Sequence, residues 1–152
     1  MTETNQLLNF NHARTEEQIN LMKKIKEDKV CPFCWDNFEK YHPKPVIKKG
    51  SWWLITKNAF PYTGTKNHFL LIYRHHISKI CQITPQASIE LVILLSWIEQ
   101  NFDVEGGGVF MRFGETKQTG SSVEHLHVQL IQGNSQESSL ASPIKVKLGY
   151  SE

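Results

Sequence analysis

The sequence predicts an α+β fold in which an antiparallel sheet packs against two main helices. A helical pattern opens the chain, two apolar runs of strand length follow each other directly, and a second helical pattern separates them from the remaining strands. Helices and strands that follow one another in blocks, rather than in strict alternation, favour an antiparallel sheet. We expect one domain, residues 1 to 152, because the chain shows no internal repeat and no linker.

The N-terminal third is predicted to contain an arm, a helix and a tight loop. Residues 1 to 12 lack periodicity and are expected to form the arm. Thr15 and Gln18 fit a capping box, and apolar residues then recur at about one turn as far as Lys29, which predicts a helix. Residues 31 to 34, Cys-Pro-Phe-Cys, follow as a loop, and two prolines shortly after it prevent a continuous helix.

The middle of the chain predicts two strands and the central core helix. Residues 52 to 55 and 69 to 73 are apolar runs of strand length with turn residues on both sides. Thr84 is a suitable N-cap, and Pro85 suits the first helical position, so a helix should run from there to about Asn101.

Three glycines after this helix introduce the last strands. Residues 109 to 113 and 123 to 131 form the predicted third and fourth strands. Residues 134 to 142 are Ser-rich and expected to be mobile. Residues 144 to 148 alternate apolar side chains with lysines, which predicts a short edge strand.

Charge and hydropathy exclude several classes of protein. The chain has 17 Lys and Arg against 15 Asp and Glu, a net charge of +2, which is far from the dense basic patch of a duplex nucleic-acid binder. Residues 1 to 30 are polar, and the longest apolar run, 91 to 95, is short, so we expect no signal peptide and no membrane span. Three cysteines without an export signal predict a cytoplasmic protein.

The predicted fourth strand carries the residues most suited to chemistry. Side chains alternate across a sheet, so three aliphatic residues share one face while His125, His127 and Gln129 share the other, beside the Gly-Ser-Ser turn of residues 120 to 122. Two imidazoles and an amide next to backbone donors can bind an anion and supply a nucleophile or a base. The spacing alone leaves open an exposed polar strand face or a two-histidine metal site.

Residues 120 to 131, Gly-Ser-Ser-Val-Glu-His-Leu-His-Val-Gln-Leu-Ile, resemble the signature of the histidine triad superfamily of nucleotidyl hydrolases and transferases. Gln129 stands where the namesake triad has its third histidine. This His-x-His-x-Gln form is similar to the branch that contains galactose-1-phosphate uridylyltransferase and the dinucleoside polyphosphate phosphorylases. Residues 57 to 61 and 68 to 76 are similar to the family's nucleoside-binding half, and the whole resemblance spans about residues 30 to 132.

The resemblance implies a role for each residue of the candidate site. His127 would attack an α-phosphorus and form a nucleotidyl-histidine intermediate, and the backbone carbonyl of His125 would accept the proton on the far ring nitrogen. Ser122 and Gln129 would hydrogen-bond the phosphate and take part in catalysis. Asn58 would contact the ribose or base of the nucleotide, although a turn-forming role for it is also open.

The implied activity is hydrolysis or phosphorolysis of a nucleotide phosphoanhydride, with a dinucleoside polyphosphate such as diadenosine tetraphosphate as the best substrate. Nucleotidyl transfer from a sugar nucleotide is an alternative, as is a zinc-stabilised nucleotide-binding module with little turnover. Because members of the family commonly pair two sheets, we also expect a homodimer.

Cys31 and Cys34 by themselves fit half of a zinc site, a redox pair or two buried thiols. The resemblance implies that these two cysteines, His76 and His125 hold a structural zinc ion in a closed tetrahedral site. His76 is preferred to the adjacent His75 because its spacing to the following helix matches the family. A redox role is disfavoured, because a thioredoxin-type pair should follow a strand.

The remaining cysteine and histidines have no evident partners in the sequence. Cys81 lies between isoleucines and is expected in the core. His12, His42 and His68 are expected at the surface or in loops. Arg112 precedes the loop before the motif. Its side chain could contact the distal phosphates of a nucleotide or simply be solvated, and the sequence leaves both alternatives open.

Overall fold

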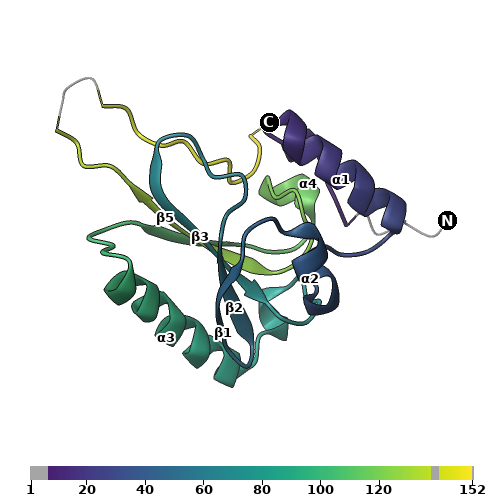
Figure 1. The fold of residues 1–152 in the computed structure, drawn as a ribbon, viewed down its shortest axis with the longest axis horizontal. Helices are drawn as coiled ribbons and strands as arrows, with labels where there is room; N and C mark the ends of the chain where they lie inside the picture. The colour runs from purple at the N-terminus through teal and green to yellow at the C-terminus, as the bar shows by residue number, and fades with distance from the viewer. Residues whose placement is uncertain (1–6, 138–140, 152) are drawn as a thin grey trace.

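The computed structural model describes residues 7–137 and 141–151 (Figure 1). Its α-helices and strands, in chain order, are α1 (Glu16–Asp28), α2 (Trp35–Tyr41), β1 (Val46–Lys49), β2 (Trp53–Lys57), β3 (Thr65–Tyr73), α3 (Pro85–Asn101), β4 (Gly108–Arg112), α4 (Thr116–Thr119) and β5 (His127–Gly133). Two 3-10 turns, Phe10–His12 and Ile80–Gln82, complete the described regular structure.

The five strands form one sheet in the order β1-β2-β3-β5-β4, and every neighbouring pair is antiparallel. The α+β class with an antiparallel sheet is therefore confirmed. The last strand, β5, lies between β3 and β4, so it has a hydrogen-bonded partner on both sides. His127 pairs with Ile72 of β3 and with Arg112 of β4. The motif strand is thus held inside the sheet rather than at an edge.

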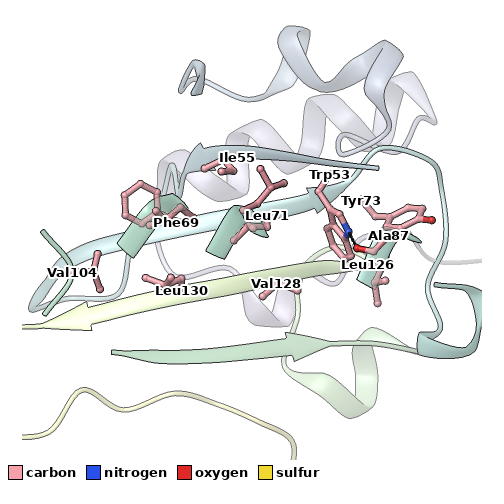
Figure 2. Close-up of a cluster of buried hydrophobic side chains, with 12 residues drawn as sticks. Trp53, Ile55, Phe69, Leu71, Tyr73, Ala87, Val104, Leu126, Val128 and Leu130 are labelled. Atoms are coloured by element: carbon pink, nitrogen blue, oxygen red, sulfur yellow. Dashed lines mark hydrogen bonds between the residues drawn. The ribbon is translucent and has the colours of Figure 1, made fainter. Parts of the chain in front are cut away.

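One face of the sheet packs against α3 and forms the main core. Alternate residues of β2, β3 and β5 supply it, and Figure 2 shows them meeting Ala87 of α3. The Trp53 indole N–H donates to the Ala87 carbonyl at 2.8 Å, which ties the helix to the sheet. Leu126 and Val128 belong to this core, as the alternation of the fourth strand predicts.

The opposite face of the sheet packs against α2. Leu54, Leu70 and Ile72 meet the fully buried Phe38 of that helix. His127 and the other polar residues of the motif lie on this second face, because they alternate with the core residues of β5.

Both long helices begin where their caps are predicted. The Thr15 hydroxyl accepts from the Gln18 amide at 3.1 Å at the start of α1, and the Thr84 hydroxyl accepts from the Ala87 amide at 3.2 Å at the start of α3. These bonds satisfy amide groups that a helix leaves unpaired at its first turn. None of the described helices is long and apolar enough to cross a membrane.

Several local predictions are wrong. Residues 144 to 148 form no strand; the segment is held instead by Arg112, whose Nη2 donates to the Lys147 carbonyl at 2.7 Å. The predicted fourth strand begins only at His127, since Val123 makes just an isolated bridge with Leu8 of the arm. Cys81 is exposed rather than buried in the core. Residues 138 to 140 of the Ser-rich segment, and 1 to 6 of the arm, lie outside the described residues.

Besides the 3-10 turns, three elements were not predicted: α2, β1 and the one-turn helix α4. Each is short, and each is stabilised by contacts from elsewhere in the chain. Phe38 of α2 has no exposed surface, and β1 pairs with β2 through a bulge. Isolated helices of this length are unstable in water, so tertiary packing decides whether they form.

Candidate active site

A pocket opens beside the motif on the face of the sheet that α3 does not cover. His127, Gln129 and Ser122 line it, together with Asn58 from the loop after β2. Its other walls come from the N-terminal arm, α1, the Cys-Pro-Phe-Cys loop and the residues that follow α2. The structure therefore brings together all the residues that the resemblance assigns to catalysis and nucleotide binding.

The imidazole of His127 is oriented by the backbone of the motif itself. Its Nδ1 donates to the His125 carbonyl at 2.7 Å, the contact that the resemblance implies. Because a carbonyl only accepts, Nδ1 carries the proton and Nε2 keeps its lone pair. The Phe33 ring packs against this imidazole in a T-shaped arrangement, at 5.3 Å between centroids, and restrains it further.

Burial keeps His127 neutral. The residue is 5% exposed, and loss of hydration lowers the pKa of its imidazole to about 4, with a smaller contribution from the positive charge of Arg112. The hydrogen bond to His125 acts in the opposite direction but is the weaker effect. At neutral pH the Nε2 lone pair is therefore available for attack on an electrophile.

Gln129 is held by His68, which the sequence placed wrongly at the surface. His68 is buried, and its Nδ1 accepts from the Tyr62 amide at 3.2 Å. Nε2 is thus the protonated nitrogen, and it donates to Gln129 Oε1 at 2.7 Å. The pKa of His68 falls to about 4, mainly through burial. This network directs the Gln129 carbonyl oxygen toward His68 and leaves its NH₂ group without a partner among the described residues.

Asn58 stands beside the same imidazole. Its Oδ1 accepts from the Phe60 amide at 2.9 Å, and its amide nitrogen contacts the His68 ring. The hydrogen bond from the Phe60 amide stabilises the turn, which is the turn-forming role that the sequence left open. Because the residue also lines the pocket, the turn places its side chain where a ligand would lie.

The N-terminal arm braces the loop that carries Ser122. The Asn9 amide donates to the Ser122 carbonyl at 2.9 Å, and the Gln18 side chain donates to the Ser122 hydroxyl at 3.4 Å. His12 Nδ1 lies 2.6 Å from the Ser121 carbonyl, and its Nε2 contacts the Tyr150 hydroxyl of the C-terminal segment, which runs beside the start of α1 (Figure 1). The prediction that His12 lies at the surface is wrong, since the residue is 7% exposed.

Gly120 permits the C-terminal segment to cross this loop. Its φ of +71° lies in the left-handed region, and an added Cβ would come within 3.0 Å of the Lys147 carbonyl. Both conditions favour glycine at the start of the Gly-Ser-Ser turn.

Cys31, Cys34, His76 and His125 form a compact cluster next to the pocket. Their ligand atoms all lie within 4.8 Å of one another. Cys31 Sγ is 3.3 Å from His125 Nδ1, and Cys34 Sγ is 3.9 Å from that nitrogen and 3.5 Å from His76 Nδ1. A tetrahedral zinc ion with bonds of about 2.3 Å to sulfur and about 2.0 to 2.1 Å to nitrogen sets such atoms roughly 3.3 to 3.8 Å apart. The donor set therefore fits zinc.

The orientation of His125 also suits a metal ligand. Its Nε2 donates to the Tyr73 carbonyl at 2.6 Å, so Nδ1 turns its lone pair toward the cysteines. A hydrogen bond from the far nitrogen to a carbonyl is the usual support of a metal-bound histidine. His75 lies outside this group, against the rings of Trp52 and Tyr73. His76 is thus the histidine of this pair that meets the cysteines.

Both cysteines of the cluster are free thiols. Desolvation raises the pKa of Cys31, and desolvation together with the neighbouring Cys31 raises the pKa of Cys34 to about 12. Such thiols react poorly as redox nucleophiles in the absence of a metal. The pair also follows α1 rather than a strand, although Cys34 stands at the N-cap position of α2.

The fold is that of the histidine triad proteins. A histidine triad family hydrolase from Clostridium thermocellum superimposes with a TM-score of 0.58 at 19% identity, over 74% of this chain and 98% of that one. A zinc-bound histidine triad protein from Mycobacterium smegmatis gives 0.54 at 15% identity, over 77% and 84%. A Plasmodium falciparum diadenosine triphosphate hydrolase gives 0.50 at 16% identity, over 59% and 60%. No family model and no curated protein matches the chain.

Proposed function

We propose that this protein is a nucleotidyl hydrolase or phosphorylase that cleaves a nucleotide phosphoanhydride through a covalent intermediate on His127. A dinucleoside polyphosphate is the substrate class we favour. The likeness in fold to a diadenosine triphosphate hydrolase and to a histidine triad hydrolase supports a reaction of this kind.

One observation carries the proposal, the orientation of the His127 imidazole. Its Nδ1 donates to the His125 carbonyl, which leaves the Nε2 lone pair free, and the ring lines the pocket. A neutral imidazole with a free Nε2 is a nucleophile toward phosphorus, and the buried carbonyl stabilises the positive charge that the ring acquires on attack.

The reaction takes two displacements at one phosphorus. In the first, the Nε2 lone pair of His127 attacks the α-phosphorus, and the anhydride P–O bond breaks with its electron pair leaving on the distal phosphate. In the second, an oxygen of water or inorganic phosphate attacks the same phosphorus, and the P–N electron pair returns to His127. Water yields a nucleoside monophosphate and a proton, whereas phosphate yields a nucleoside diphosphate.

Ser122 and Gln129 would bind the oxygens of the attacked phosphate. The NH₂ group of Gln129 is available for this because its carbonyl oxygen is held by His68. Asn58 would contact the nucleoside, with the apolar wall formed by α1 and Phe33 enclosing the base. Donors arranged before the substrate arrives stabilise charge that spreads over the phosphate in the transition state.

Cys31, Cys34, His76 and His125 would hold the zinc ion, which supplies structural support because protein ligands fill all four positions. His125 also presents its carbonyl to His127, and Phe33 of the cysteine loop packs on His127. The metal ligands of this chain would therefore orient the nucleophile without taking part in the displacements.

Product analysis tests the proposed reaction. The protein would be offered diadenosine tetraphosphate, a sugar nucleotide and adenosine phosphoramidate, each with and without inorganic phosphate, and the products identified by mass spectrometry. Nucleoside monophosphate from the tetraphosphate supports hydrolysis, and diphosphate that appears only with phosphate supports phosphorolysis. Transfer of the nucleotide from the sugar nucleotide to an added second sugar 1-phosphate, without cleavage of the tetraphosphate, would instead support the transferase alternative. A nucleotide that binds and survives intact would support the binding module.

Replacing Gln129 with histidine is expected to change which leaving group is accepted. An amide cannot protonate a leaving amine at neutral pH, whereas imidazole can. The unmodified protein should therefore cleave diadenosine tetraphosphate and be weak on the phosphoramidate. Gln129→His should shift the ratio of the two kcat/KM values at least about tenfold toward the phosphoramidate, since general acid catalysis typically contributes a hundredfold or more. An unmodified protein faster on the phosphoramidate would refute this role of Gln129.

The expected homodimer has a candidate surface on α3. Ile89, Val92 and Ile93 belong to the predicted central core helix, yet they are 63%, 66% and 60% exposed. A groove joins this helix face to Val109 of β4, which is an edge strand of the sheet. An apolar helix face next to an open strand edge suits a second copy related by a two-fold axis.

Sedimentation equilibrium tests the homodimer. The unmodified protein is expected to sediment as a dimer at micromolar concentrations, and Ile89→Glu with Ile93→Glu should convert it to a monomer because each change would bury a charge at the interface. Leu148→Glu, at another exposed apolar residue, is the matched control. A monomeric unmodified protein would disprove the interface.

Cytoplasmic location and absence of duplex nucleic-acid binding stay predictions from the sequence.

A further inference from the structure

Two arginines converge on the active-site pocket without a carboxylate among its described lining residues. Arg14 and Arg112 both line the pocket, and no Asp or Glu does so. The ion pairs found in the described residues lie elsewhere and involve neither arginine. A partly enclosed site with two positive charges and no described counter-charge favours an anion.

Arg112 reaches the pocket from the strand next to the nucleophile. It pairs directly with His127 across β4 and β5, and side chains of such a pair share a face of the sheet. The residue is 6% exposed. Its Nε donates to the Thr119 carbonyl at 3.0 Å, and its Nη2 donates to the Tyr62 hydroxyl at 2.8 Å and to a carbonyl of the C-terminal segment. No described residue accepts from Nη1, so a fixed guanidinium keeps free donors.

Arg14 reaches the pocket from the short segment between the N-terminal arm and α1. Its guanidinium lies 4.2 Å from the centre of the Tyr62 ring and donates to the Phe60 carbonyl. Tyr62 therefore contacts both arginines, with its ring under Arg14 and its hydroxyl on Arg112. Tyr62 thus holds the guanidinium groups of Arg14 and Arg112 near each other.

The two positive charges influence one another and the imidazoles of His68 and His127. Partial desolvation lowers the pKa of Arg14, and the charge of Arg112 lowers it further, while Tyr62 acts in the opposite direction. Both arginines lower the pKa of His68, and Arg112 lowers that of His127. Arg112 pairs with His127 across β4 and β5, and both arginines line the same pocket as His127 and Gln129, so the two cations lie close to the residues proposed to bind the attacked phosphate.

We propose that Arg14 and Arg112 form a subsite for the phosphates beyond the one that His127 attacks, so that the substrate is a nucleotide with at least one further phosphate on its leaving side. This inference rests on the proposed function and assigns two residues of this chain to the phosphates of the leaving group. The planar fork of arginine matches phosphate oxygens, and two forks can bind a chain of phosphates where one binds a single group. A phosphoramidate or a simple phosphate ester offers these residues nothing to bind.

Calorimetry with two nucleotides that differ in their distal phosphates tests the subsite. The probes are AMP and α,β-methylene-ATP, whose bridging carbon resists cleavage at the α-phosphorus, and the matching uridine pair covers a different base. The unmodified protein should bind the methylene triphosphate at least about tenfold more tightly than the monophosphate, as charged hydrogen bonds predict. Arg14→Gln should reduce this ratio about tenfold. Arg14 is exposed, so the variant should fold normally.

Lys23→Gln is the matched control, because it removes one positive charge from an exposed position of α1 outside the pocket. It should leave the affinity ratio unchanged. Arg112→Lys keeps the charge but loses the fork, and it should also lower the ratio. A ratio unchanged by Arg14→Gln overturns the subsite even when both nucleotides bind. If the unmodified protein binds none of the four nucleotides, the proposed function fails as well.

Discussion

Replacing His127 with alanine is expected to lower kcat at least about a thousandfold, because removal of a covalent nucleophile leaves only the catalysis supplied by binding. Nucleotide affinity should change far less, since the ring forms its bond to phosphorus only during the reaction. Steady-state rates on diadenosine tetraphosphate and calorimetric binding measure the two effects. Mass spectrometry of the quenched unmodified protein should show a nucleotidyl adduct that the variant lacks.

His75→Ala is the matched control for this variant. It removes an exposed imidazole that faces Trp52 and Tyr73 instead of the pocket, and it should keep full activity. Because Phe33 packs on the His127 ring, the melting temperature of each variant must be measured alongside its rates. Turnover retained by folded His127→Ala would exclude the covalent mechanism.

Loss of zinc is expected to have the largest effect on stability. The purified protein should contain about one zinc ion per chain, and Cys31→Ser should lower both the zinc content and the melting temperature. Structural zinc contributes roughly 10 to 16 kcal/mol in small domains, which exceeds the net stability of most single domains. The loop before α2 and the start of β5 would lose their common anchor. Metal analysis and thermal unfolding measure the two quantities.

Cys81→Ser is the matched control, because Cys81 is exposed and outside the cluster. It should leave zinc content and stability unchanged. A second comparison separates the neighbouring histidines: His76→Ala should lose zinc, whereas His75→Ala should retain it. If the purified protein contains no zinc, or if it melts at the same temperature after its zinc is removed, the structural metal site is disproved. Zinc loss in His75→Ala alone would reassign the ligand.

Much of the regular structure could be predicted because it depends on neighbours in the sequence. The caps at Thr15 and Thr84 act within one helical turn, and both long helices begin at them. The alternation of residues 125 to 130 also places Leu126 and Val128 in the core as expected. Short elements without such local signals were missed, and the predicted edge strand at 144 to 148 was wrong because alternation alone supplies no hydrogen-bonding partner.

The identity of the site residues likewise came from a local motif, but their environment did not. The alternation of the motif strand leaves open whether its polar face is exposed, and the structure buries His125, His127 and Gln129 to 5% exposure or less. A signal for His68 was present, since it alternates with Leu70 and Ile72, two buried residues on the same face of β3. That alternation predicts burial of His68, yet it cannot name Gln129 as its partner.

By itself the sequence determined the helix starts, the strand alternation and the chemical groups available to the site. Only the tertiary structure decided which groups meet, because these contacts join residues far apart in the chain and depend on strand order and packing. His68 and Gln129 are 61 positions apart, Cys31 and His125 are 94 apart, and His12 and Ser121 are 109 apart. The pairing of β3 with β5 sets the first contact. The contacts of Cys31 with His125 and of His12 with Ser121 form because the arm, α1 and the cysteine loop pack over the motif. The same packing places Arg14 beside the pocket.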